Sequence, residues 1–392
     1  MKQRAIRSLG LKAGALTLFA ALAGPSWAVD WGGYFRAGPG ASKKDASRAC
    51  YGLNGPGLKY RLGNECDIYG EFFLAQNMKA EGVDYRAVLM TNLFNPQTDT
   101  GSASVGINQM YVQGSGFDIA PSTTFWIGKR FYGRADVHIV DTFYTNLSGV
   151  GAGADTPVGP GKLGIAWFKT DETANRSGNR LNLDFSGLPV NPGGSLRILA
   201  TFTQGNFTGG KSGAGLTLQH TQKDVLGGSN DLWLQFARGS AGLNGNFGTL
   251  DAGSDVKGVR VVESLNWQIG AFGGQAQAVW QNDKAGGVKT DSGTIGGRVS
   301  YALTNHFKLV AEAGYSQKKP EGGATQKLTK VTIAPTLSTG PGFWKRPELR
   351  LYVTSAKWND AANAAAGPGG LTGVGDGKTS GTSYGAQVEI WF

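Results

Sequence analysis

The strongest constraint on the fold of this chain is a two-residue alternation of apolar and polar side chains, which recurs along the sequence. The final segment, Tyr384 to Phe392, places Tyr, Ala, Val, Ile and Phe on one face and Gly, Gln, Glu and Trp on the other. Successive side chains of a β-strand point to opposite faces, so this pattern predicts strands with two different faces. Clusters of Gly, Asn, Asp, Ser and Pro separate such segments, and helical patterning is nearly absent. We therefore expect an all-β fold.

Two segments near the N-terminus show the same alternation. The first spans residues 30–37, and the second is predicted to be a single strand over residues 59–76. Each places its polar side chains and some large aromatic residues on one face: Tyr34 and Arg36 in the first, and Arg61, Tyr69 and Glu71 in the second.

The first 28 residues have the pattern of a secretion signal. Four cations precede an apolar stretch over residues 13–24, and Ser26-Trp27-Ala28 ends in the small-x-small pattern of a cleavage site. We expect residues 1–28 to be removed and residues 29–392 to form one domain. Loss of the four cations lowers the formal charge from +10 to +6. That charge is mild for the length, and no basic cluster interleaved with aromatic residues indicates a nucleic-acid partner.

An exported chain meets an oxidising compartment, where its two cysteines can pair. Cys50 and Cys66 lie close in sequence, and a disulfide that closes a short external loop is the favoured interpretation. Two buried free thiols are the alternative.

The alternation fits a soluble sandwich or an outer-membrane barrel, and four features favour the barrel. They are the secretion signal, the terminal aromatic Phe392, aromatic residues near strand ends, and long polar Gly-rich stretches that read as external loops. No apolar run after residue 28 approaches the ~20 residues that a spanning helix needs. The length corresponds to roughly 16–18 strands at about 20 residues per strand and connection, and a barrel of that size encloses water. The pattern thus predicts an outer-membrane channel and leaves its solute open.

Enzymatic and metal chemistry find little support in the sequence. The three histidines, His138, His220 and His306, are scattered without ligand spacing, and no Ser or Asp nucleophile is matched to a histidine. The stretch from Gly205 to Ser212 fits a phosphate-binding loop, but an alternating strand follows it where that motif needs a helix. We expect no catalytic residue, no metal site and no cofactor.

Several sequence blocks resemble the maltoporins, the maltodextrin-selective porins of Gram-negative outer membranes. The two most specific are Tyr60-Arg-Leu-Gly-Asn-Glu-Cys66 and Gly128-Lys-Arg-Phe-Tyr132. Further blocks follow in the order of that family, as far as Gly385-Ala-Gln-Val-Glu-Ile-Trp391. The resemblance implies an antiparallel barrel of about 18 strands, a homotrimer and a third loop folded into the pore. It also implies oligosaccharide solutes, and it admits a phage or a periplasmic sugar-binding protein as a partner.

The resemblance also implies which residues contact the sugar. In this family an aromatic slide faces a track of polar residues. The slide positions carried over by motif are Tyr34, Tyr69, Trp344 and Trp391, with Phe143 on the third loop. The polar-track positions are Arg36, Arg61, Glu71, Asn108, Arg134, Asp136 and Asp141.

Some positions depart from the family pattern. Phe143 replaces a tyrosine of the third loop, and Asn108 stands where the track has an arginine. The second loop lacks the tryptophan that reaches into a neighbouring subunit in this family, and Phe94 is a remote candidate to replace it. Another slide position aligns with Leu232, next to Trp233. The preferred solute therefore stays open between maltodextrins, sucrose and another oligosaccharide. A general porin or a channel for acidic solutes is the other class of function.

Overall fold

The computed structural model describes residues 29–392 apart from 44–45, 97–101 and 172. The expected secretion signal, residues 1–28, lies outside the described residues. Strands dominate the described chain, with the bounds β1 Asp30–Ala37, β2 Gly40–Lys43, β3 Ala46–Ser47, β4 Ile68–Ala80, β5 Val83–Asn95, β6 Ser104–Ser115, β7 Thr124–Arg130, β8 Ala135–Val137, η1 His138–Val140, β9 Thr142–Thr145, β10 Gly149–Val158, β11 Gly161–Thr170, β12 Gly178–Asn191, β13 Gly194–Gly205, β14 Ser212–Val225, β15 Gly228–Gly239, β16 Lys257–Ile269, β17 Phe272–Ala285, β18 Val288–Ala302, β19 Phe307–Pro320, β20 Gln326–Ser338, β21 Glu348–Trp358, α2 Asp360–Ala365 and β22 Ser380–Trp391.

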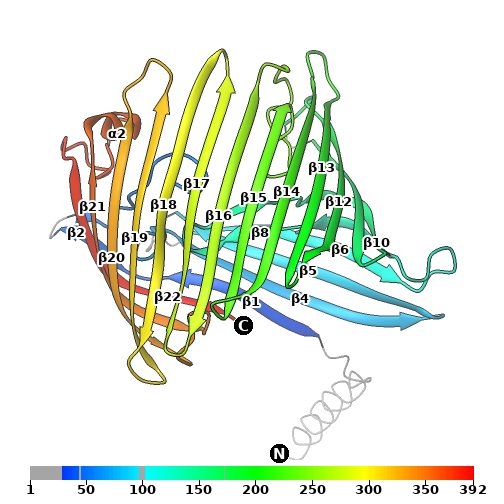
Figure 1. The fold of residues 1–392 in the computed structure, drawn as a ribbon, viewed down its shortest axis with the longest axis horizontal. Helices are drawn as coiled ribbons and strands as arrows, with labels where there is room; N and C mark the ends of the chain where they lie inside the picture. The colour runs from blue at the N-terminus through cyan, green and yellow to red at the C-terminus, as the bar shows by residue number, and fades with distance from the viewer. Residues whose placement is uncertain (1–28, 44–45, 97–101, 172) are drawn as a thin grey trace, which may run out of the picture.

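The long strands form one closed antiparallel barrel (Figure 1). Its 18 strands are β1, β4–β7 and β10–β22. The barrel is closed because β1 pairs with β4 on one side and with β22 on the other. Residue Phe392 completes the closure: its backbone exchanges two hydrogen bonds with Gly33, at 2.9 and 3.1 Å. Closure leaves no free sheet edge, which a lipid environment requires. The predicted all-β barrel is confirmed.

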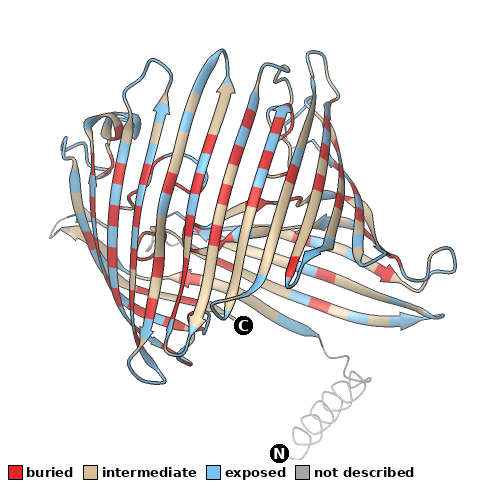
Figure 2. Ribbon diagram, in the orientation of Figure 1, coloured by how far each residue is buried: buried red, intermediate tan, exposed pale blue. Residues whose placement is uncertain are grey.

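The two faces of each strand meet different surroundings, which gives the banded pattern of burial in Figure 2. In β21 the outward residues Leu349, Leu351 and Val353 are exposed, whereas the inward Glu348 and Arg350 are buried. An apolar outer face and a polar inner face are the arrangement of an outer-membrane barrel. No helix of the described chain is long and apolar enough to cross a membrane.

The two rims of the barrel differ. Two-residue turns such as Glu81-Gly82 and Gly270-Ala271 join strands at one rim, and the three longest connections, residues 38–67, 131–148 and 359–379, lie at the other. The C-terminus lies at the turn rim, and α2 lies at the opposite rim (Figure 1). In such barrels the short turns are periplasmic and the long loops are external, so we take the loop rim as the outer one.

The first loop, residues 38–67, corrects one prediction. Residues 59–67 are not part of a strand, because β4 begins only at Ile68. This stretch packs against the inner wall, where wall side chains satisfy its backbone. Lys330 donates to the Tyr60 carbonyl, and the Leu62 amide donates to Glu312 at 2.8 Å. The apolar–polar alternation continues through residues 59–67, but their backbone groups bond to side chains of the wall and not to a neighbouring strand.

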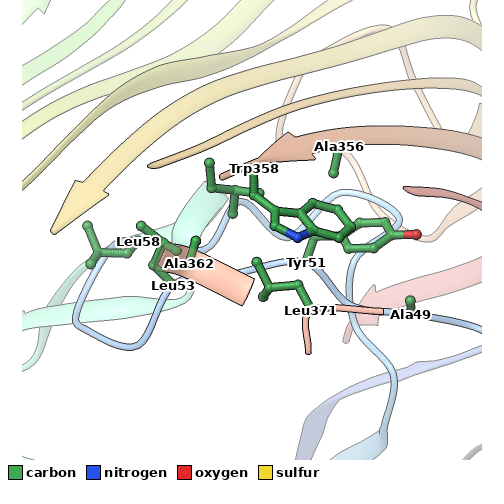
Figure 3. Close-up of a cluster of buried hydrophobic side chains, with 9 residues drawn as sticks. Ala49, Tyr51, Leu53, Leu58, Ala356, Trp358, Ala362 and Leu371 are labelled. Atoms are coloured by element: carbon green, nitrogen blue, oxygen red, sulfur yellow. The ribbon is translucent and has the colours of Figure 1, made fainter. Parts of the chain in front are cut away.

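Apolar contacts hold the same loop in place (Figure 3). Tyr51 stacks on Trp358 of β21, with ring centroids 5.3 Å apart. Leu53 and Leu58 join them, and Ala362 and Leu371 of the last loop cover the cluster. Burial of such a cluster anchors the first loop on the wall through the hydrophobic effect.

A glycine is required where this loop crosses the wall. Gly63 has φ +57°, and a Cβ there would lie 2.4 Å from Tyr352. Both the left-handed backbone and the close contact exclude a larger residue.

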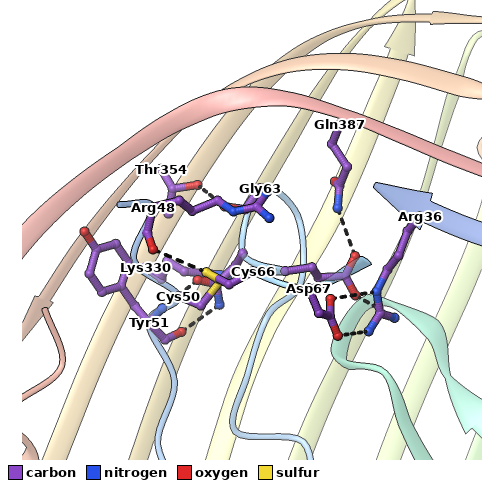
Figure 4. Close-up of a disulfide and its surroundings, with 12 residues drawn as sticks. Arg36, Arg48, Cys50, Tyr51, Gly63, Cys66, Asp67, Lys330, Thr354 and Gln387 are labelled. Atoms are coloured by element: carbon purple, nitrogen blue, oxygen red, sulfur yellow. Dashed lines mark hydrogen bonds and ion pairs between the residues drawn. A yellow bond between two sulfur atoms is a disulfide. The ribbon is translucent and has the colours of Figure 1, made fainter. Parts of the chain in front are cut away.

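The predicted disulfide is confirmed. Cys50 and Cys66 are bonded, with Cα atoms 6.0 Å apart, and they join the two arms of the first loop (Figure 4). Asn64 bridges the same arms, since it accepts from the Tyr51 amide at 2.6 Å and donates to the Tyr51 carbonyl at 2.7 Å. The loop that the disulfide closes is folded inward and does not project outward as expected.

The third loop, residues 131–148, also folds into the barrel and carries β8, η1 and β9. The Ile139 amide donates to Gln275 at 3.2 Å, and the Tyr144 hydroxyl donates to Gln277 at 3.0 Å. Trp233 lies beneath the loop, with its ring 5.8 Å from that of Tyr144. The sequence left open whether Leu232 or Trp233 points inward at one slide position. Trp233 points inward, but it is buried under the third loop.

The disulfide should stabilise the first loop against denaturant. Replacing both Cys50 and Cys66 by serine should lower the free energy of unfolding by roughly 3 kcal/mol, because a short closed loop restricts the unfolded chain. Urea unfolding of the reconstituted barrel, followed by tryptophan fluorescence, measures this change. Equal midpoints for the wild type and the double variant would contradict it.

Candidate functional site

Four aromatic side chains form a row across the barrel interior. The rings of Tyr69 and Tyr34 lie 6.3 Å apart, and those of Trp391 and Trp344 lie 6.4 Å apart. Tyr34 and Trp391 are direct partners in the pairing of β1 with β22, which joins the two halves. The row runs from the loop end of β4 to the turn between β20 and β21. The structure thus brings together the four predicted slide residues.

An arginine from β1 lies beside the upper half of this row. The Arg36 guanidinium lies 5.3 Å from the Tyr69 ring centroid. It forms ion pairs with Glu65 at 3.0 Å, Asp67 at 2.9 Å and Asp141 at 3.1 Å. These three acids come from the first and third loops, so Arg36 ties both inward loops to the barrel wall.

A second arginine, Arg61, connects the loops to the middle of the row. It pairs with Glu65 at 2.8 Å and with Glu389 of β22 at 3.2 Å, and it donates to the Tyr34 hydroxyl. The side chain of Glu389 is completely buried. Removing one partner from so buried a pair would leave an uncompensated charge.

The lower half of the row has its own cation. The Arg346 guanidinium lies 4.3 Å from the Trp391 ring centroid and pairs with Glu389 and Glu348, each at 3.1 Å. Arg350 completes this cluster on β21 by pairing with both carboxylates. The aromatic row is therefore bordered along its length by arginines held in fixed positions.

A polar group surrounds Tyr69 at the loop end of the row. The Tyr69 hydroxyl donates to Glu71 at 2.6 Å, and the Asn108 amide donates to the Tyr69 hydroxyl at 3.1 Å and to Glu71 at 2.8 Å. Asn108 sits at a β-bulge of β6, where the register with β5 shifts; a bulge re-aims a side chain. Phe94 is the direct partner of Tyr69 in the pairing of β4 with β5 and is partly exposed.

The remaining predicted residues lie on the β8–β9 hairpin of the third loop. Asp136 and Phe143 are direct partners across this hairpin. The Arg134 guanidinium is stacked between two rings, 3.8 Å from the centroid of Phe143 and 4.0 Å from that of Phe131. Arg134 also interacts electrostatically with Glu71 and Tyr69, so the hairpin stands near the start of the row.

The charge states of two third-loop residues follow from their surroundings. Burial in the barrel acts to raise the pKa of Asp141, but Arg61 and Arg36 outweigh it and hold that pKa below its usual value. Burial lowers the pKa of His138 to about 4, against the opposing effect of Glu389. At neutral pH the site therefore combines an ionised Asp141 with a neutral His138.

Sequence reasoning missed the role of several residues. His138 packs edge-on against both tryptophans, 5.4 Å from the Trp344 ring and 5.7 Å from the Trp391 ring. No periodic signal could have placed it, because it belongs to a short 3-10 helix of an inward loop. Glu389 and Arg346 could have been found, since Glu389 shares the polar face of its strand with Trp391. The described residues contain no group of three or more His, Cys, Asp or Glu side chains placed to hold a metal ion.

The protonation of His138 can be tested directly. We expect its ring to titrate near pH 4, because burial and the cations Arg61 and Arg346 outweigh Glu389. An unfolded chain takes up this proton near pH 6.5, so stability should fall as pH drops from about 6.5 to about 4. Nuclear magnetic resonance of the protein labelled in its histidine rings measures this titration. The His138 signal is the one that is missing in the variant His138→Gln. A midpoint near 6.5 for that signal would contradict the expectation.

Comparison with solved structures finds the same type of barrel at very low sequence identity. OpdK of Pseudomonas aeruginosa, solved with vanillate, is 9% identical, with a TM-score of 0.50, and the match covers 93% of this chain and 98% of that one. OpdL of the same organism is 11% identical, with a TM-score of 0.49 and coverage of 93% and 97%. OmpT of Vibrio cholerae is 9% identical, with a TM-score of 0.45 and coverage of 93% and 97%.

The sequence itself matches a family model described as LamB porin, over residues 29–392. The match spans all of the barrel and includes every residue of the aromatic row. The chain belongs to the LamB porin family and is an outer-membrane channel, not an enzyme.

Proposed function

We propose that this porin conducts maltose- and maltodextrin-like oligosaccharides by facilitated diffusion along the aromatic row. The observation that carries the proposal is the row of Tyr69, Tyr34, Trp391 and Trp344 beside a line of arginine–carboxylate pairs. A non-selective pore has no need of such a file. In this proposal the third-loop hairpin with Arg134, Asp136 and Phe143 faces the sugar from the other side.

The chemistry of the two surfaces suits a sugar ring. A glucopyranose has an apolar C–H face and a rim of hydroxyl groups. Aromatic rings offer flat contact area for the face at small entropic cost. Arginine donates hydrogen bonds and carboxylates accept them, so the bordering pairs can exchange bonds with the hydroxyls.

Repetition of similar contacts allows movement. An oligosaccharide that loses its contact with one aromatic ring gains a contact with the next, so no single site holds it strongly. Conduction requires binding that is favourable enough to enter the pore and weak enough to leave it. The rigid ion pairs matter here because they keep the polar groups in place while the solute passes.

Planar-bilayer conductance titrated with maltotriose, sucrose and an anionic solute tests the proposal. Preferential block by maltotriose supports a maltodextrin channel, and preferential block by sucrose reassigns the solute. Equal, weak effects of all three would make the chain a general porin.

Loss of a row tryptophan should weaken sugar binding without widening the pore. We expect Trp391→Ala and Trp344→Ala each to lose roughly 1–3 kcal/mol of sugar affinity, by analogy with bases stacked on aromatic residues. The measurement is the sugar concentration that halves the ion current, with open conductance recorded in the same channels. Trp280→Ala is the matched control, because Trp280 is exposed on the outer face. If both row variants show the wild-type sugar titration, the row does not contact the sugar and the prediction is wrong.

Charge on the third loop should act on ions as well as on sugar. Arg134→Ala and Asp136→Ala should change both sugar block and cation/anion selectivity, because a charged group near the pathway sets the local potential. Reversal potentials across a salt gradient measure the selectivity. Arg176→Ala is the control, since Arg176 lies in another loop and pairs with Asp251. Unchanged reversal potentials in both third-loop variants would place the hairpin away from the ion path.

A hydroxyl restored on the third loop should favour maltodextrins. We expect Phe143→Tyr to strengthen block by maltotriose, because the ring gains a group that donates and accepts hydrogen bonds. Block by sucrose provides the comparison within the same channels. A weaker maltotriose block in the variant would contradict this role of position 143.

We also propose that the channel is a homotrimer, in keeping with its family. Closed three-fold symmetry requires one wall of each barrel to contact its neighbours. An unheated electrophoretic band at trimer mass, confirmed by light scattering, is the expected result. Monomer mass in both measurements would contradict it.

A further inference from the structure

We propose that the outer face of β15–β21 binds the phosphate groups of the glycolipid lipid A in the outer leaflet, through a row of cations at the loop rim. The row begins with Arg238, Lys257, Lys284 and Lys289. Each is the direct partner of the next across neighbouring strands. Lys319, Lys327 and Lys357 continue it at the loop ends of β19, β20 and β21. We call these seven residues the basic belt.

The strand register shows that the belt faces outward. Directly paired residues share a face of a sheet. Arg238 follows the buried interior residue Gln235 by three positions on β15 and therefore lies on the opposite, outer face. Phe236, two residues before Arg238, is exposed on the outer face, as is Trp280, four residues before Lys284. The strands that carry the belt lie side by side in the barrel wall (Figure 1). The belt therefore lies at the outer edge of the apolar band.

The belt is electrostatically incomplete by itself. Like charges directly opposite one another on adjacent strands repel, and neighbouring strands are only about 4.8 Å apart. None of the seven cations forms an ion pair with a residue of the described chain. Among the seven, Lys319 alone has an acid, Asp291, as its direct partner across the strands. A ligand with more than one phosphate group would relieve this repulsion.

The two rims are unequal, which identifies the leaflet. At the turn rim the outward residues of the same strands are apolar or aromatic, as with Phe272, Tyr301, Phe307 and Leu337. A general preference of lysine for membrane interfaces would place cations at both rims. On the outer face of β15–β21 the cations lie at the loop rim alone, which matches a bilayer whose outer leaflet is the more strongly anionic one. Clusters of Lys and Arg at a membrane surface recognise such headgroups.

Lipid binding by the purified full-length porin in detergent tests the proposal. The probe is labelled bisphosphorylated lipid A, compared with the same lipid lacking phosphates and with phosphatidylglycerol. Inorganic phosphate serves as competitor. We expect the bisphosphorylated lipid to bind at least about tenfold more tightly than either comparison lipid. Equal binding of all three lipids, or displacement by inorganic phosphate at equal phosphate concentration, would overturn the proposal.

Variants of the belt separate it from the rest of the protein. The triple variant K257Q/K284Q/K289Q should lose at least about tenfold in lipid A affinity, and the matching Lys→Arg triple should retain it. Lys79, Lys162 and Lys223 lie at the turn ends of their strands and on the inner face, away from the belt. The triple variant K79Q/K162Q/K223Q is therefore the control for the loss of three lysines. Sugar block should be unchanged in both belt variants, because the belt lies outside the lumen, so this result is independent of the proposed solute. Wild-type lipid A affinity in the belt variant would overturn the assignment.

Discussion

The absence of water in the hydrocarbon core is the constraint on which the rest of this structure depends. An unsatisfied backbone group in lipid costs several kcal/mol, so a spanning sheet must close on itself. Here the pairing of β1 with β22 provides the closure, and Phe392 completes it with two hydrogen bonds to Gly33. The same pairing places Tyr34 opposite Trp391. The join of the first and last strands is thus also the middle of the aromatic row.

Closure creates an interior too wide to be filled by wall side chains alone. The first and third loops fold into it, and their backbone groups bond to polar residues of the wall such as Glu312 and Gln275. Arginines then bind both loops to the wall, as Arg36 does through acids of each loop. Charges that would be costly in an apolar core are paired and hydrogen-bonded here, in contact with a polar lumen. This combination fixes the polar groups of both loops against the wall.

The inner and outer surfaces of the barrel therefore differ in the groups that they present. The inner surface carries the aromatic row and its ion pairs, which suit a solute with an apolar face and a hydroxyl rim. The outer surface carries an apolar band and, at the loop rim, the unpaired cations of the basic belt. The two-residue period of the strands makes this separation possible, because neighbouring residues of one strand face different environments.

That period is also why so much could be predicted from the sequence. Alternation, the terminal aromatic residue and the cysteine pair determined the all-β barrel, the inward direction of Tyr34, Tyr69 and Trp391, and the disulfide. Where a segment alternates without a strand partner, the prediction failed, as it did for residues 59–67. Only the tertiary structure decided that His138 packs against two tryptophans and that Trp233 lies under the third loop. The physical reason is that alternation records which face a residue occupies, whereas contacts between loops and wall depend on closure of the whole barrel.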